Sequence, residues 1–135
     1  NQDLLLVRPQ TFVNLSGEAV QKILEFYKLT PEDIVVVHDD LDITLGKFKI
    51  ATNSSSAGHN GVQDIIDSLG TQKFKRVRIG INPDTGEILS TGDAHLPVRS
   101  PAEAGDFVLG KFSDGEKEKL KKISEDILNA IKSLL

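Results

Sequence analysis

The feature that most restricts the fold of this chain is a run of four β-branched residues, Ile34-Val35-Val36-Val37. Such a run is typical of a central strand covered on both faces of its sheet. We expect this strand to stop at His38. The segment that follows, His38-Asp39-Asp40-Leu41-Asp42, is polar, and polar side chains are unfavourable to bury without partners.

The remaining apolar patterns predict an alternation of strands and helices. Further strands are expected at Leu4–Val7, around Phe48 and Ile50, and from Phe74 to Ile81. Helical spacing predicts helices over residues 15–28, 62–69 and 114–135, the last with a capping box at Ser113 and Glu116. The predicted class is therefore α/β, a single domain over residues 1–135 with a mixed, twisted sheet flanked by helices.

Composition excludes several classes of protein. The 135 residues include no cysteine, which rules out a disulfide scaffold and a thiol nucleophile. With 16 basic and 20 acidic residues the net charge is −4, which argues against a general polyanion binder. No apolar stretch has the length of a membrane span and no signal peptide opens the sequence, so we expect a cytoplasmic protein without a membrane partner.

The first residues suggest a piece of a longer protein. The sequence contains no methionine, and Asn1-Gln2-Asp3 leads directly into the apolar run that begins at Leu4. We therefore expect a chain that begins in the middle of a fold.

Two polar segments precede predicted helices, near strand ends where ligands usually meet an open α/β sheet. In residues 11–17, Asn14 or Ser16 is placed to cap the following helix. In Gly58-His59-Asn60-Gly61 the glycines allow the backbone to approach a ligand, and Asn60 offers an amide to it. An ordinary capped helix start is the alternative at both places, with Asn60 as the cap in the second.

The acidic segment 38–42 allows three interpretations. A carboxylate beside a strand end can orient an imidazole that acts as a general base. Three carboxylates could instead hold Mg²⁺, or the segment could be a solvated acidic turn.

Basic side chains recur at two-residue spacing on two predicted strands. Lys47 and Lys49 share one face of a strand, and Arg76 and Arg78 share a face of another. Such a cluster could clamp a phosphate. A strand edge protected by charge is the alternative.

Taken together and in order, five stretches of the sequence resemble the bacterial-type peptidyl-tRNA hydrolases. They are Arg8–Gly17, Val37–Asp42, Gly58–Gly61, Arg78–Ile81 and Val108–Ser113. Members of that family cleave the ester that joins a peptide to the 3′ ribose of tRNA. They use no metal, and the resemblance implies no other cofactor.

The resemblance also implies roles for individual residues. Phe12 and Asn14 would contact the peptide part of the substrate. Asp39 would orient the catalytic histidine, and Asn60 would hold the ester carbonyl or the attacking water. Asn14, Asp39 and Asn60 are thus the expected catalytic set, and they should converge on one cleft.

The resemblance extends to two basic residues and two longer regions. Lys49 and Arg78 fall where the family grips tRNA phosphate. Residues 82–113 fall where the family has a mobile lid over the peptide channel, and residues 114–135 match its final helix.

The sequence departs from the family pattern in two ways. The family's first strand and its later Thr-Arg-His-Asn stretch, which carries the catalytic histidine, have no match here. The three histidines His38, His59 and His95 occupy other positions, so we expect the chain alone to be weakly active or inactive. The loop at residues 53–57 is also rich in serine where the family has glycine.

The expected function is therefore hydrolysis of peptidyl-tRNA by general-base activation of water. The alternatives are a tRNA-binding module without activity and a Mg²⁺-dependent phosphoryl hydrolase that uses Asp39, Asp40 and Asp42. Without the family's first strand, the edges of Ile34–Val37 and Leu4–Val7 would be exposed, which predicts self-association through these edges.

Overall fold

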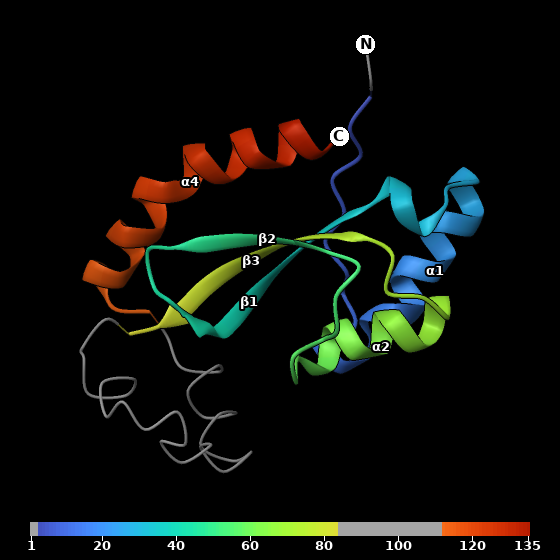
Figure 1. Cartoon of the computed structure of the whole chain (residues 1–135), viewed down its shortest axis with the longest axis horizontal. Helices are drawn as coiled ribbons and strands as arrows, with labels where there is room; N and C mark the ends of the chain where they lie inside the picture. Colours follow the sequence, from blue (N-terminus) through green and yellow to red (C-terminus); the bar gives the residue numbers. More distant parts are fainter. Residues whose placement is uncertain (1–2, 84–111) are drawn as a thin grey trace. The chain divides into compact units, whose positions relative to one another are not determined.

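The computed structural model describes residues 3–83 and 112–135, whose elements are shown in Figure 1. The chain divides into two compact units. The first comprises residues from the ranges 1–34 and 52–75, and the second comprises residues from the ranges 35–51 and 76–135. Most of the lid region predicted at residues 82–113 lies outside the described residues.

Two helices, α1 (Ser16–Tyr27) and α2 (Asn60–Leu69), make up most of the first unit. They pack against each other, and Leu24, Val62 and Ile65 are buried in this unit. Both helices end at a residue in the left-handed conformation, as helices often do. The helices predicted over residues 15–28 and 62–69 are confirmed.

The start of α1 is capped by a residue that is distant in the sequence. The short 3₁₀ helix η1 (Val13–Leu15) precedes α1, and a second one, η2 (Pro31–Asp33), follows it. The backbone N–H of Gly17 donates to Asp64 Oδ2 of α2 at 2.7 Å, whereas the Ser16 hydroxyl donates to the Val13 carbonyl. The predicted cap by Asn14 or Ser16 is therefore wrong, because a carboxylate 47 residues away satisfies the free N–H.

The second unit is built around a sheet of three strands in the order β1-β3-β2. The strands are β1 (Val35–Thr44), β2 (Phe48–Thr52) and β3 (Lys75–Asn82). In Figure 1, β1 and β3 run in the same direction and β2 runs in the opposite one, so the sheet is mixed. The predicted α/β class is confirmed.

Helix α4 (Asp114–Leu134) also belongs to the second unit. It starts with the predicted capping box, in which Ser113 and Glu116 each accept the other's backbone N–H. Within residues 3–83 and 112–135, no helix combines the length and the apolar character needed to cross a membrane.

Strand β1 differs from its prediction in two ways. It continues to Thr44 instead of stopping at His38, because β3 supplies polar partners to the residues that follow. It also lies at the edge of the described sheet, with Val37 45% exposed, and β3 takes the central place. Within the described residues, β1 is therefore an edge strand and not the predicted central strand covered on both faces.

The strand predicted at Leu4–Val7 is not formed in the described structure. These four residues are between 48% and 82% exposed. A strand needs a neighbour to pair with its backbone groups, and the described sheet does not include this segment. The apolar run alone was therefore insufficient to make a strand.

Candidate functional site

Two of the predicted catalytic residues, Asn14 and Asn60, lie in the first unit. Asn14 belongs to η1 and Asn60 is the first residue of α2, and η1 packs against α2. The approach is close because residue 61 is a glycine, where a Cβ would lie 2.8 Å from the Val13 carbonyl oxygen. Both asparagines are exposed. Two segments far apart in the sequence thus present their amides on the same unit.

The amide of Asn60 is not used to cap its own helix. His59 is the N-cap of α2, and its Nδ1 accepts the backbone N–H of Val62 at 3.2 Å. The capping role considered for Asn60 is therefore wrong. The Asn60 side chain does not have to satisfy the helix start, and a donor and an acceptor remain at the surface for a ligand.

The segment around Asn14 is apolar and open to solvent. Phe12 is 80% exposed, Val13 62% and Leu15 49%. Exposed apolar side chains grouped in this way usually mark a contact surface. Beside an amide, they suit an extended peptide, whose backbone needs hydrogen bonds and whose side chains need apolar contacts.

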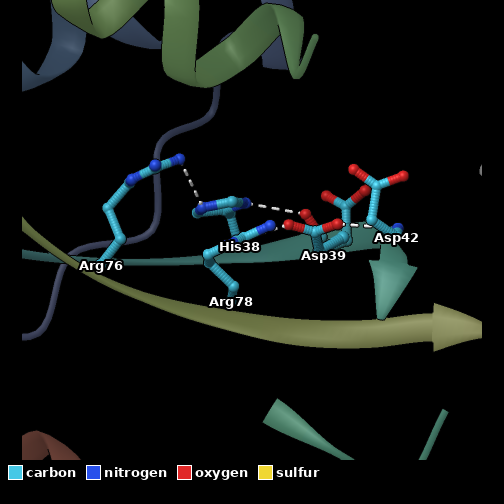
Figure 2. A network of polar contacts seen from close by, with 6 residues as sticks. His38, Asp39, Asp42, Arg76 and Arg78 are labelled. Carbon is cyan, nitrogen blue, oxygen red and sulfur yellow. Dashed lines mark hydrogen bonds and ion pairs between the residues drawn. The ribbon is translucent and has the colours of Figure 1, made fainter. Parts of the chain in front are cut away.

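The third predicted catalytic residue, Asp39, lies on β1 in the second unit and is half-buried. Figure 2 shows Arg76 and Arg78 of β3 in contact with the segment around it. Arg76 Nη1 lies 3.3 Å from His38 Nε2, and His38 Nδ1 lies 2.7 Å from the Asp39 carbonyl oxygen. The strand carrying Asp39 is therefore tied to its neighbour by specific side-chain contacts.

An ion pair continues this network. Arg78 Nε donates to Asp40 Oδ2 at 2.7 Å, and the other Asp40 oxygen accepts the Asp42 N–H at 2.8 Å. The Asp40 side chain is 9% exposed and that of Arg78 is 22% exposed. Both contacts between strands join residues 38 apart, as expected for parallel neighbours in register.

The two arginines differ in what they can do. Arg76 is only 2% exposed. Burial lowers the pKa of its guanidinium, the charge of Arg78 lowers it further, and the carboxylate of Asp40 raises it. Arg76 is thus a buried structural cation and not part of a surface strip. Arg78 binds Asp40 through Nε, and its side chain is 22% exposed.

Lys49 lies on β2 and is exposed. It lines a groove of about 470 Å³ in the second unit, between the β1–β2 turn and α4. Lys47 lines the same groove, together with the acidic residues Asp42 and Asp126. Asn14, Asp39 and Asn60 do not line it. The groove therefore brings together two of the predicted phosphate-binding lysines but none of the predicted catalytic residues.

The acidic segment does not have the geometry of a metal site. Both oxygens of Asp40 are engaged, one by a guanidinium and one by a backbone N–H. Among residues 3–83 and 112–135, no group of three or more His, Cys, Asp or Glu side chains is placed to hold a metal ion.

The sequence did not predict the partners of the acidic segment. It gave no role to Arg76 beyond a phosphate clamp and none to His38 in positioning. A signal was nevertheless present, because polar residues repeat at two-residue spacing on both strands, His38 and Asp40 on one and Arg76 and Arg78 on the other. Complementary groups at the same spacing indicate neighbouring strands.

Comparison with known proteins identifies the family. The sequence matches the peptidyl-tRNA hydrolase family over residues 1–135. The chain belongs to this family. It is similar to the peptidyl-tRNA hydrolase of Brevibacillus brevis, with 46% identity over 107 residues, which are 78% of this chain and 56% of that protein. It is also similar to that of Thermotoga petrophila, with 39% identity over 135 residues, 98% of this chain and 64% of that protein.

A solved structure agrees with this family assignment. The crystal structure of peptidyl-tRNA hydrolase from Acinetobacter baumannii matches with a TM-score of 0.75 and 30% identity, over 93% of this chain and 57% of that one. The chain thus spans about three-fifths of the length of the peptidyl-tRNA hydrolases that it matches.

Proposed function

We propose that this chain binds peptidyl-tRNA and supplies side chains that hydrolyse the ester between the peptide and the tRNA. The observation that carries the proposal is the packing of η1 on the start of α2, which presents the amides of Asn14 and Asn60 on one unit. The exposed Phe12 beside them provides an apolar contact for the peptide.

The proposed chemistry is general-base hydrolysis. A histidine, oriented by the Asp39 carboxylate, removes a proton from water as the water oxygen attacks the ester carbonyl carbon. The Asn60 amide donates to the carbonyl oxygen as negative charge develops on it. The bond to the ribose 3′ oxygen then breaks, and that oxygen takes up the proton. The products are a peptide carboxylate and tRNA with a free 3′ hydroxyl.

The base is the component that these 135 residues do not supply in the family's motif. His59 caps α2, and His38 contacts Arg76. We therefore expect slow hydrolysis by this chain alone, on the order of 10²–10⁴-fold below a protein with a well-placed base. A tRNA-binding module without activity is the second candidate. It would bind peptidyl-tRNA in the same way but would not hydrolyse it.

Hydrolysis and binding measured in parallel test the proposal. Release of peptide from peptidyl-tRNA is followed under single-turnover conditions, and affinity is measured for peptidyl-tRNA and for the same tRNA without its peptide. We expect tighter binding of the peptidyl form, and loss of that preference in Asn60→Ala. Equal affinity for the two tRNAs would overturn the proposal, whereas preference without any hydrolysis would support the second candidate.

Removal of the Lys49 ammonium should weaken binding to tRNA of any sequence. Each phosphate contact releases condensed counterions, so Lys49→Met should lower the slope of log K against log salt concentration by about one. Fluorescence anisotropy at four salt concentrations measures the slope. Lys132→Met, which removes an exposed lysine of α4, is the matched control. The same slope in both variants would exclude Lys49 from phosphate binding.

We also propose that two copies of the chain associate through exposed strand edges. β1 is an edge strand of the described sheet, and neither proline nor lysine interrupts it. The other edge strand, β2, carries Lys49 and begins just after Lys47. Light scattering should therefore detect a dimer at high concentration, and Val37→Lys should shift it toward monomer. A monomer at all concentrations would contradict this proposal.

A further inference from the structure

Polar side chains of β3 hold the segment of β1 that carries Asp39. Each contacts a residue of that segment, either at a side chain or at a backbone carbonyl. The contacts are Arg76 to His38, Arg78 to Asp40, and Asn82 to the carbonyl of Leu41. The segment therefore has three ties to a neighbouring strand within a few residues.

The contacts of His38 determine where its proton lies. A backbone carbonyl can only accept a hydrogen bond, so Nδ1, at 2.7 Å from the Asp39 carbonyl oxygen, must carry the proton. A guanidinium can only donate, so Nε2, at 3.3 Å from Arg76 Nη1, must offer its lone pair. These two contacts thus fit the tautomer that carries its proton on Nδ1. A proton on Nε2 would place two donors against each other.

The same geometry separates His38 from the role of general base. The lone pair that would take a proton from water is directed at Arg76, a buried cation. The Nδ1 proton, in turn, fixes the peptide plane between Asp39 and the next residue. Because a side chain leaves the backbone at a fixed angle, fixing this peptide limits the direction of the Asp39 carboxylate.

We propose that His38 and Arg76 are positioning residues for Asp39, an inference that rests on the function proposed above. Arg76 selects the tautomer of His38, and this tautomer holds the Asp39 carbonyl. Neither residue touches the substrate. Errors of about 1 Å in the placement of catalytic groups reduce rates by about a hundredfold. Residues that hold Asp39 in place therefore have a large effect on the rate.

The tautomer is measured by long-range ¹H–¹⁵N correlation of the histidine side chains. The His38 signals are assigned by their loss in His38→Phe. We expect the proton on Nδ1 of His38 at pH 7.5, and population of the Nε2–H form in Arg76→Met. The ¹³C shift of the Asp39 backbone carbonyl should change in Arg76→Met and return toward the original value in Arg76→Lys, which restores a charged donor.

A neighbouring core residue provides the structural control. Val77 is fully buried on β3 next to Arg76 but has no polar group. Val77→Ala should lower the melting temperature without moving the His38 tautomer or the Asp39 carbonyl shift. An Nε2–H tautomer in the unsubstituted chain, or an Asp39 carbonyl shift unaffected by Arg76→Met, would overturn the proposal.

Kinetics separates this inference from the proposed function. Where hydrolysis of peptidyl-tRNA is measurable, Arg76→Met should lower kcat by about ten- to a hundredfold and leave KM within about twofold, because Arg76 touches no substrate. A rise in KM with kcat unchanged would contradict a positioning role for Arg76. If the tautomer behaves as expected but no hydrolysis occurs, the proposed activity fails while the structural role of His38 and Arg76 stands.

Discussion

Replacing Asp40 with alanine is expected to lower the free energy of unfolding by about 3 kcal/mol. The Asp40 carboxylate is 9% exposed and pairs with Arg78 at 2.7 Å. Removing one partner of a buried pair leaves the other charge without compensation, and this typically costs about 3–5 kcal/mol. Without Asp40, the guanidinium of Arg78 would face the nearby guanidinium of Arg76 uncompensated. The charge of Arg78 already lowers the pKa of Arg76. Urea denaturation measures the change.

Two further variants make this prediction specific. Arg78→Met combined with Asp40→Ala removes both charges, and the double variant should be more stable than Asp40→Ala alone. Glu18→Ala breaks an exposed ion pair with Lys22 of similar length, and it should have no measurable effect. If Asp40→Ala behaved like Glu18→Ala, the buried pair would not support the strand.

Replacing Gly80 with alanine is expected to destabilise the sheet by a similar amount, about 3 kcal/mol. A Cβ at this position would clash with the Thr44 carbonyl oxygen and would lie 2.7 Å from that of Ile43. Both contacts are with the backbone of β1, so no side-chain rotation relieves them. The end of β1 would have to move away from β3, and thermal unfolding monitored by circular dichroism reports the loss.

The matched control is a glycine with free space around it. Gly115 lies in the first turn of α4, and nothing is within 4 Å of a Cβ placed there. Gly115→Ala should leave stability unchanged or raise it slightly, because alanine favours the helix. Equal effects of the two substitutions would mean that the close approach at Gly80 is not a constraint on the fold.

Local patterns predicted the elements whose limits are set locally. Helix α2 ends at Gly70, where a left-handed residue is needed, and α4 starts at the Ser113–Glu116 capping box. Both signals lie within a few residues of the boundary they mark. The α/β class followed from the alternation of predicted strands and helices, which can be recognised without knowing the tertiary contacts.

The failed predictions concern features that depend on distant residues. β1 extends through its acidic residues because Arg76 and Arg78 lie beside it, and α1 is capped by Asp64. The sequence shows these groups but not their proximity. Leu4–Val7 shows the opposite case, since an apolar run has strand propensity but pairs only where a neighbour is present.

The residues of the candidate site were named from the sequence and from the family resemblance, and their roles stay predictions. Short motifs singled out Asn14, Asp39 and Asn60, and the structure places the first and last of them on packed elements of one unit. Periodicity could not reveal that His59 caps α2 in place of Asn60, because either residue suits that position. Nor could it show that Arg78 binds Asp40 and not Asp39.

The function that we propose requires Asn14, Asp39 and Asn60 to act on the same acylated end of tRNA. A double-mutant cycle tests it most directly, with Asp39→Asn and Asn60→Ala made singly and together and the affinity for peptidyl-tRNA measured for each. The cycle of Asn14→Ala with Asn60→Ala, both within one unit, is the reference. We predict a coupling energy of about 0.5 kcal/mol or more between Asp39 and Asn60. Changes that add to within about 0.3 kcal/mol would place the two residues at separate sites and contradict the account.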